Sequence, residues 1–245
     1  LAGPDGTLQA TFYQKHKLAG MPKAIRDGRL EKVSGKESGI LWVEDLTGLV
    51  GGVQMNVLEF HVWGSLRQQP DLPHRMVFDI DPDEGLSFGE VRQAALDLRG
   101  VLEALGLHSW PLLSGGKGIH VVVPLVPEAN WEAVKSFCQD FAELLARTDP
   151  SRFVANMSKA RRDGRMFLDY LRNGQGATAI CPWSTRARPG GPCAVPVSWD
   201  ELPSLKGANV FDVFAAAARA QQPEPWVGYF ESEQTLTDSM RTAVR

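Results

Sequence analysis

Apolar and polar residues alternate along this 245-residue chain in patterns that predict both strands and helices. The apolar run Met76-Val77-Phe78 leads into Asp79-Ile80-Asp81, and together they predict a strand that ends in two acids. Ser87 and Glu90 have the spacing of a helix capping box. A helix that ends at Gly106 is therefore predicted. Its apolar residues recur at helical spacing: Val91, Ala94, Ala95, Leu98, Val101, Leu102 and Leu105.

Two further apolar runs, residues 107–113 and 119–125, flank the short segment Ser114-Gly115-Gly116-Lys117-Gly118 and predict a β-hairpin. A second amphipathic helix is predicted over residues 131–147, with Cys138 on its inward face. These elements together indicate an α+β fold, in which antiparallel sheets are flanked by helices.

The chain reads as a single domain over residues 1–245 with three regions. Residues 1–72 are expected to form an N-terminal α/β region, which includes a strand near residues 40–44. Residues 73–200 form the predicted core, and residues 201–245 a helical tail.

Asp79 and Asp81 lie two residues apart, so in a strand they point to the same face, about 7 Å apart at Cα. Two carboxylates on one face repel each other unless cations lie between them. Divalent metals with oxygen ligands supply such cations, and a pair of these ions is the usual apparatus of phosphoryl transfer. The alternative is a plain strand that runs into the acidic turn Pro82-Asp83-Glu84-Gly85.

The glycine-rich turn is a candidate anion site. Exposed backbone N–H groups beside Ser114 and Lys117 can bind an anion, and His120 at the start of the returning strand can reach the same place. The segment is not a P-loop, because Lys117 is followed by Gly118 and then by a strand. The alternative is an ordinary hairpin turn.

A third acid, Asp169, lies in the apolar segment 164–173, which predicts a strand with Phe167 and Leu171 on the same face as this acid. Two metals need a third carboxylate, and Asp169 is otherwise unpaired. Basic residues flank it on both sides: Lys159, Arg161, Arg162 and Arg165 before it, Arg186 and Arg188 after it. Basic runs are usually solvated faces, but this arrangement favours a polyanion site.

Composition narrows the class of protein. Apolar residues make up 43% of the chain, enough for a substantial core. Three cysteines without a Cys-x-x-Cys motif argue against a disulfide framework and a zinc site. No signal peptide or membrane span is evident, so we expect a cytoplasmic protein without a membrane partner. The net charge of −3 restricts any nucleic-acid contact to local basic clusters.

Several segments, in this order, resemble the polymerase domain of bacterial ligase D, the multifunctional end-joining ligase, within the archaeo-eukaryotic primase superfamily. They are Phe12-Tyr13-Gln14-Lys15-His16, Gln54-Met55 with Glu59-Phe60-His61-Val62-Trp63, Val77-Phe78-Asp79-Ile80-Asp81-Pro82, Ser114-Gly115-Gly116-Lys117-Gly118-Ile119-His120, Asp169-Tyr170-Leu171-Arg172-Asn173 and Ser184-Thr185-Arg186-Ala187-Arg188. The resemblance implies a primase-like fold, whose catalytic sheet is antiparallel and resembles an RNA-recognition motif. It also implies templated nucleotidyl transfer, preferably of ribonucleotides, to a 3′-hydroxyl at gaps and broken ends during non-homologous end joining.

The same resemblance implies roles for individual residues. Asp79, Asp81 and Asp169 would hold two divalent metal ions, manganese or magnesium. A second set would contact the nucleotide, and His120 within it would also be catalytic: His61, Ser114, Lys117, His120, Arg186 and Arg188. Lys15 would bind the 5′-phosphate on the far side of a gap.

The implied partners are DNA ends, gapped duplex DNA with a 5′-phosphate and nucleoside triphosphates. Ligase and nuclease modules and the bacterial Ku end-binding protein are expected as well. Two departures from the family pattern are visible. Trp183 stands where the family commonly has Tyr, and the opening Leu1-Ala2-Gly3-Pro4-Asp5-Gly6 resembles a point inside the domain, so we expect the family's first helix and strand to be missing from this sequence.

Two alternatives from other classes remain open. Residues 76–81 also resemble the first motif of haloacid-dehalogenase-like phosphatases, but Asp83 stands where that motif has Thr or Val, and no later Asp-Asp pattern follows. The other alternative is a non-catalytic DNA-end-binding module that keeps the fold. The presence of all three aspartates, Lys117 and His120 argues against such a module.

Overall fold

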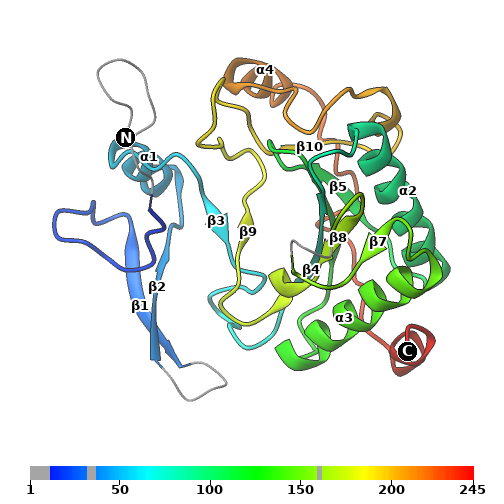
Figure 1. Ribbon diagram of the computed structural model, residues 1–245. Coiled ribbons are helices and arrows are strands. Elements are labelled where there is room, and N and C mark those ends of the chain that lie inside the picture. The colour runs from blue at the N-terminus through cyan, green and yellow to red at the C-terminus, as the bar shows by residue number, and fades with distance from the viewer. Residues whose placement is uncertain (1–11, 32–36, 159–161) are drawn as a thin grey trace.

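The computed structural model describes residues 12–31, 37–158 and 162–245, and its centre is a six-stranded sheet (Figure 1). The strand order is β10-β5-β6-β4-β8-β7. Their bounds are β4 Arg75–Pro82, β5 Trp110–Leu113, β6 Ile119–Pro124, β7 Phe153–Val154, β8 Met166–Asp169 and β10 Val195–Pro196. The opening segment 1–6, and Lys159 and Arg161 of the basic segment before Asp169, lie outside the described residues.

Neighbouring strands of this sheet are antiparallel from β10 to β8, as predicted. At the other edge, β7 pairs in parallel with β8, so the sheet is mixed at that edge. A parallel neighbour needs a crossover connection, because the chain must return to the same end of the sheet.

Two long helices cover one face of the sheet (Figure 1). α2 spans Phe88–Ala104 and α3 spans Trp131–Thr148, close to the predicted bounds. The predicted capping box is formed, since the Ser87 hydroxyl accepts from the Glu90 N–H and the Glu90 carboxylate accepts from the Ser87 N–H. Asn130 caps α3 in the same way, by accepting from the Ala133 N–H.

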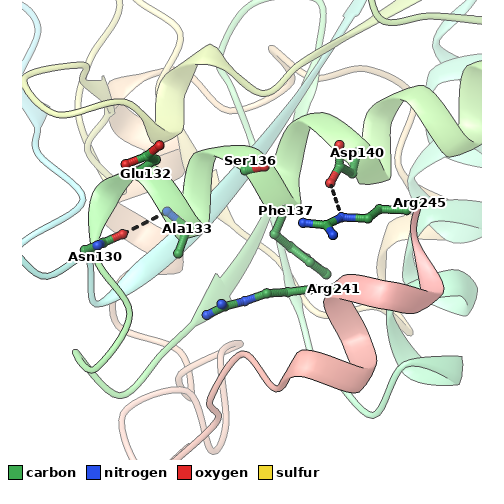
Figure 2. Close-up of a pocket in the computed structure, with 8 residues that line it drawn as sticks. All are labelled: Asn130, Glu132, Ala133, Ser136, Phe137, Asp140, Arg241 and Arg245. Atoms are coloured by element: carbon green, nitrogen blue, oxygen red, sulfur yellow. Dashed lines mark hydrogen bonds and ion pairs between the residues drawn. The ribbon is translucent and has the colours of Figure 1, made fainter.

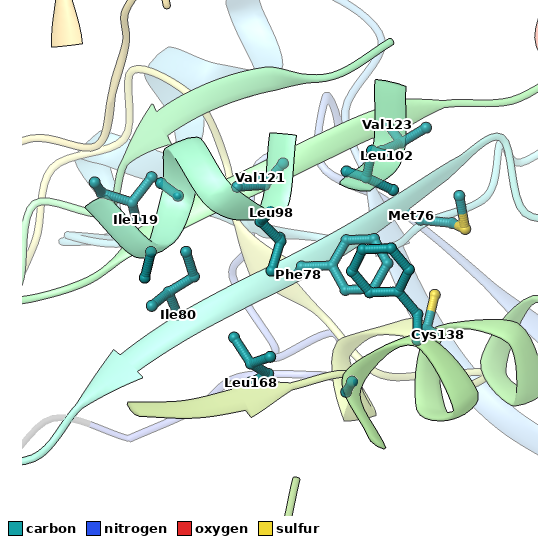
Figure 3. Close-up of a cluster of buried hydrophobic side chains, with 14 of the residues drawn as sticks. Met76, Phe78, Ile80, Leu98, Leu102, Ile119, Val121, Val123, Cys138 and Leu168 are labelled. Atoms are coloured by element: carbon teal, nitrogen blue, oxygen red, sulfur yellow. The ribbon is translucent and has the colours of Figure 1, made fainter. Parts of the chain in front are cut away.

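β4 separates the hydrophobic core from the candidate site because its side chains alternate between the two faces. Met76, Phe78 and Ile80 are fully buried, and Figure 3 shows them packed with residues of the helices and of β6 and β8. These neighbours include Leu98, Leu102, Ile119, Val121, Val123, Cys138 and Leu168. Asp79 and Asp81 therefore point to the opposite face, away from α2 and α3.

Cys138 is buried in the core, as predicted from its place on α3. Burial raises the pKa of its thiol well above the ordinary value. The other two cysteines are also free thiols, so the structure agrees with the absence of a disulfide framework.

The opposite face of the sheet looks toward a two-stranded ribbon of β3, His61–Val62, and β9, Ala179–Ile180 (Figure 1). A smaller apolar cluster fills the space between them: Val77, Leu112, Val122, Ala179, Ile180, Ala194, Trp226 and Tyr229. His61 lies within β3 and residues 180–187 lie beside it, so the site is built where this ribbon approaches the sheet.

The N-terminal region contains a hairpin of β1, Arg26–Glu31, and β2, Glu37–Trp42, followed by helix α1, Leu46–Gln54. The strand predicted near residues 40–44 is thus present but begins earlier. α1 packs closely because its buried residues are glycines, Gly48, Gly51 and Gly52. Leu46 and Val53 remain exposed on its outer side.

The C-terminal tail is largely irregular, with short helices at η3, Leu202–Ser204, α4, Val213–Arg219, and α5, Asp238–Ala243. Across the described ranges, none of the helices combines the length and the apolar character needed to cross a membrane.

Candidate active site

Three neighbouring strands bring His120, Asp79 and Asp169 into one row. Asp79 of β4 is paired directly with His120 of β6 on one side and with Asp169 of β8 on the other. Directly paired residues of adjacent strands share a face of the sheet. Asp81 follows two residues after Asp79 and lies on that face too, so the three predicted carboxylates share one face at the same end of β4.

The glycine turn, Ser114 to Gly118, lies against the same end of β4. A Cβ atom at Gly118 would overlap the Ile80 carbonyl oxygen, so only glycine allows this approach. The same position is 3.6 Å from Asp79 Oδ1. The predicted anion turn and the predicted metal carboxylates are therefore adjacent, although Ile80 and Gly118 are far apart in the sequence.

The donors of the turn are largely engaged within the protein, which corrects the expectation of exposed N–H groups. The Ser114 hydroxyl donates to the Gly118 carbonyl at 2.7 Å and accepts from the Gly116 N–H at 3.2 Å. The Gly115 N–H donates to the Ala208 carbonyl at 3.0 Å. Burial of the turn requires these partners, because an unpaired buried N–H is costly. Lys117 is the exposed residue of the turn.

Both predicted arginines lie over this turn. A Cβ atom on Gly115 would meet the Arg186 side chain, and one on Gly116 would lie 3.4 Å from the Arg188 guanidinium. Arg186 Nη1 also donates to the Ser114 carbonyl at 2.5 Å. The turn is thus lined on its open side by cations, namely Lys117, Arg186 and Arg188.

Glu59 connects this cationic edge to His61, and we did not single it out from the sequence. Its Oε2 lies 2.8 Å from His61 Nε2, and its Oε1 accepts from the Ala187 N–H at 2.8 Å and from Arg186 Nε at 3.2 Å. Burial alone raises the pKa of Glu59, but the Ala187 N–H, His61 and Arg186 outweigh it and lower that pKa. The i, i+2 spacing to His61 was the available signal.

The N-terminal segment reaches the same place. Tyr13 packs edge-on against the His61 ring, with 5.5 Å between ring centroids, and its hydroxyl lies 2.7 Å from Thr178 Oγ1. Lys15 is exposed, and its Nζ lies 5.2 Å from the centre of the Tyr13 ring. Phe12 is also exposed. Tyr13 thus lies between Lys15, the candidate 5′-phosphate residue, and His61, a candidate nucleotide residue.

Two arginines neutralise the carboxylates, which corrects the expectation that Asp169 is unpaired. Arg172 lies 3.1 Å from Asp79 Oδ2 through Nη2 and 3.2 Å from Asp169 Oδ2 through Nε. Arg162 Nη1 lies 2.5 Å from Asp81 Oδ2. The sequence placed Arg162 in a basic segment and Arg172 in the segment that follows Asp169, but could not show which acids they face.

The end of β8 differs from the sequence prediction. The strand stops at Asp169, and Leu171–Asn173 form a 3-10 turn, so Leu171 does not share a strand face with this acid. The cause is local, because Asp169 Oδ1 accepts from the Leu171 N–H at 2.9 Å and bends the chain.

The environments of Asp79 and Asp169 drive their pKa values in opposite directions. Burial raises the pKa of Asp79, but His120 and Arg172 outweigh that effect and lower it to about 2. Burial also raises the pKa of Asp169, and the negative charges of Asp79 and Asp81 add to this, against the opposing effect of Arg172. His120 Nε2 lies 3.3 Å from Asp79 Oδ1, while its buried Nδ1 has no partner among the described residues.

The donor set suits a hard divalent cation, since carboxylate oxygens are the ligands that magnesium and manganese prefer. In the part of the chain that the structure describes, no three acidic, histidine or cysteine side chains are gathered closely enough to form a ready metal site. The Arg172 guanidinium nevertheless spans Asp79 and Asp169, which shows that these carboxylates can share one cation. The proposed metal set stays a prediction that the chemistry of the residues fits.

One pocket lies away from these residues. Figure 2 shows a pocket of about 320 Å³ between α3 and α5, where Arg245 approaches Asp140 with Nε to Oδ2 at 3.5 Å. None of the residues predicted for the site lines it. The candidate active site lies instead on one face of the sheet, at one end of β4.

Comparison with known proteins decides the family. The model of the LigD primase-polymerase domain matches residues 2–226. This chain belongs to the LigD primase-polymerase domain family. As a member it is a nucleotidyltransferase of the primase-polymerase class with an α+β fold, and the phosphatase alternative falls away.

Relatives support this assignment. The chain is 37% identical to the multifunctional non-homologous end joining protein LigD of Pseudomonas aeruginosa over 98% of its own length. It is 31% identical to the bifunctional LigD of Bacillus subtilis over 94% of its length. The chain spans only 29% and 37% of those two proteins. It also resembles the solved polymerase domain of Mycobacterium tuberculosis ligase D in complex with DNA, with a TM-score of 0.81, 25% identity, and coverage of 95% of this chain and 83% of that one.

Proposed function

We propose that this domain adds nucleotides, under the direction of a DNA template, to a primer 3′-hydroxyl at gaps and broken ends during non-homologous end joining. The observation that carries the proposal is the row of His120, Asp79 and Asp169 beside the glycine turn, in a chain of the LigD polymerase family. An acidic row next to a cationic turn is the arrangement that phosphoryl transfer between nucleotides needs, because charge develops on the transferred phosphate.

Asp79, Asp81 and Asp169 would hold two divalent ions, manganese or magnesium. When bound, such ions activate the attacking hydroxyl and neutralise the leaving pyrophosphate. The protein contributes the carboxylates on a rigid strand end, with the Asp79 carboxyl fully ionised at neutral pH because its pKa is about 2. His120 fixes Asp79 from the neighbouring strand.

The cations above the turn would bind the triphosphate. Arg186 and Arg188 present planar guanidinium groups suited to phosphate oxygens, and Lys117 adds an exposed ammonium. Ser114 would act mainly by shaping the turn, because its hydroxyl is engaged with Gly118 and Gly116. His61, held by Glu59, would face the nucleotide from β3.

Lys15 would bind the 5′-phosphate across a gap, and Phe12 or Tyr13 would stack on a terminal base. The related Mycobacterium tuberculosis domain was solved with DNA, which supports DNA as the substrate here. Ligase and nuclease modules and a bacterial Ku protein would be the wider partners, and a DNA substrate implies a cytoplasmic site of action.

We further propose a preference for ribonucleoside triphosphates. A site that hydrogen-bonds a 2′-hydroxyl leaves polar groups unpaired when a deoxynucleotide binds, and such sites discriminate strongly. Ser114 and His61 are the residues to test. Both side chains already have a partner, Gly118 for the Ser114 hydroxyl and Glu59 for His61 Nε2. Equal kcat/KM for the two sugars would contradict this preference.

One assay tests the function. A 5′-phosphorylated gapped duplex with a labelled primer is incubated with the protein, Mn²⁺ and nucleoside triphosphates. Template-matched extension supports the proposal. Binding of the gap without extension would instead indicate a non-catalytic end-binding module, and release of the 5′-phosphate would indicate a phosphatase.

A further inference from the structure

Arg172 occupies the space between the two most buried carboxylates of the site. Its guanidinium contacts Asp79 Oδ2 and Asp169 Oδ2 at 3.1 and 3.2 Å. The two carboxylate side chains are each 14% exposed, whereas the Arg172 side chain is 41% exposed. The arginine therefore lies across the mouth of the pair, with open solvent on its outer side.

The main chain holds Arg172 in this position from both sides. On one side, Asp169 Oδ1 accepts from the Leu171 N–H at 2.9 Å. On the other side, the buried Asn173 side chain hydrogen-bonds both main-chain groups of Val77 at 2.8 Å. The backbone of Arg172 is thus fixed between β8 and β4, while its long side chain can leave the carboxylates without unfolding either strand.

All four oxygens of the carboxylate pair have partners. Asp79 Oδ1 faces His120 Nε2 at 3.3 Å, and Asp169 Oδ1 accepts from the Leu171 N–H. The two Oδ2 atoms are the ones that Arg172 contacts. Asp79 and Asp169 would hold a divalent ion together, and such an ion would compete with the guanidinium that lies between them.

We propose that Arg172 is a resident counter-cation of the site, which holds Asp79 and Asp169 together until a divalent ion displaces it. The inference rests on the proposed metal-dependent function and adds to it a residue that sets metal affinity. The energetic reason is the repulsion between two neighbouring carboxylates, which some cation must offset in every state of the protein. Removal of the guanidinium leaves that repulsion to be relieved by the metal alone.

The test compares Mn²⁺ binding, measured by electron paramagnetic resonance of the free ion, for the full chain and its variants. Arg172→Gln should bind Mn²⁺ on the order of tenfold more tightly, since the ion no longer competes with the guanidinium for the two carboxylates. Its melting temperature in EDTA should fall, and its rise on addition of Mn²⁺ should exceed that of the unmodified protein. Arg172→Lys keeps the charge but lacks the forked guanidinium, so its Mn²⁺ affinity should lie between those of the unmodified protein and Arg172→Gln.

Arg152→Gln is the matched control, because Arg152 pairs with Asp97 and Asp149 at the surface and should leave Mn²⁺ affinity unchanged. Equal or weaker Mn²⁺ binding by folded Arg172→Gln would overturn the role of Arg172 and leave the proposed function standing. Failure of the unmodified protein to bind Mn²⁺ more tightly than Asp79→Asn would instead contradict the metal-dependent function itself, and the role of Arg172 with it.

Discussion

The Asn173 side chain pairs with the Val77 main chain as a neighbouring strand would. Asn173 Oδ1 accepts from the Val77 N–H and Asn173 Nδ2 donates to the Val77 carbonyl, both at 2.8 Å. β8 ends at Asp169, so its ladder does not extend as far as Val77, and this amide takes the vacant place. Asn173 thereby lets the chain turn away after Asp169 while β4 stays straight up to Asp79.

Asn173→Ala should lower the free energy of unfolding by about 2–4 kcal/mol, because it leaves two main-chain groups of β4 buried without partners. Urea unfolding measures this change. Asn209→Ala, at an exposed position, is the control and should be neutral within about 0.5 kcal/mol. A stability loss no larger than that of the control would show that water or a shifted strand replaces the amide.

Much of this arrangement follows from the sequence because it depends on local patterns. The capping box of Ser87 and Glu90 marked the start of α2, and the alternation of β4 placed Asp79 and Asp81 on one face. The glycine turn lies where it was expected, because the two apolar runs that flank it form the paired strands β5 and β6. These signals need only neighbours along the chain.

Long-range pairs could not be predicted in the same way. Arg162 is 81 residues from Asp81 in the sequence, and Glu59 is 127 residues from Arg186. Pairs so far apart in the sequence produce no periodic pattern of residues from which they could be predicted. The contacts that cover the glycine turn were missed for the same reason, since the Gly115 N–H and the Ser114 carbonyl pair with Ala208 and Arg186 from the C-terminal half.

Glu59 should act as a positioning residue for His61 and Arg186. Glu59→Gln removes the charge that both cations face, so KM for the nucleotide should rise about tenfold while kcat changes little. Steady-state primer extension at varied nucleotide concentration measures both constants. Glu59→Asp should recover part of the loss, and Glu103→Gln, which affects a surface pair with Arg99, should change neither constant. A fall in kcat alone would contradict a role in nucleotide binding.

His74 should make the protein less stable in mild acid. Burial, with a contribution from the positive charge of Arg75, lowers its pKa from 6.5 to about 4, while its hydrogen bond with Gly64 opposes this. Between those values the unfolded chain binds a proton that the folded protein refuses, so stability is full above pH 6.5 and falls as the pH drops toward 4. The loss amounts to at most about 3 kcal/mol.

Urea unfolding at pH 7 and pH 4.5 measures the effect of His74. His74→Gln should show a smaller difference between the two pH values than the unmodified protein does. His108→Gln, at an exposed histidine, should leave that difference unchanged. If His74→Gln keeps the whole difference, other groups account for the acid sensitivity.

Lys15→Ala should weaken binding to gaps that carry a 5′-phosphate and reduce the slope of log Kd against log salt by about one unit. Ends with a 5′-hydroxyl should be affected much less. Lys17→Ala is the matched control, because Lys17 Nζ is already paired with Asp27 at 2.7 Å. Fluorescence anisotropy with the two kinds of end gives the comparison. Equal losses for both would make Lys15 a general backbone contact.

The most direct measurement is single-turnover primer extension on a 5′-phosphorylated gap, with Asp79→Asn, Asp81→Asn and Asp169→Asn beside the unmodified protein. Asp97→Asn is the control, since Asp97 pairs with Arg152 away from the row of acids. Each of the three substitutions should slow extension by at least about a thousandfold while the variants stay folded, and the control should extend normally. Near-normal extension by any of the three would contradict the assignment of that carboxylate to the chemistry.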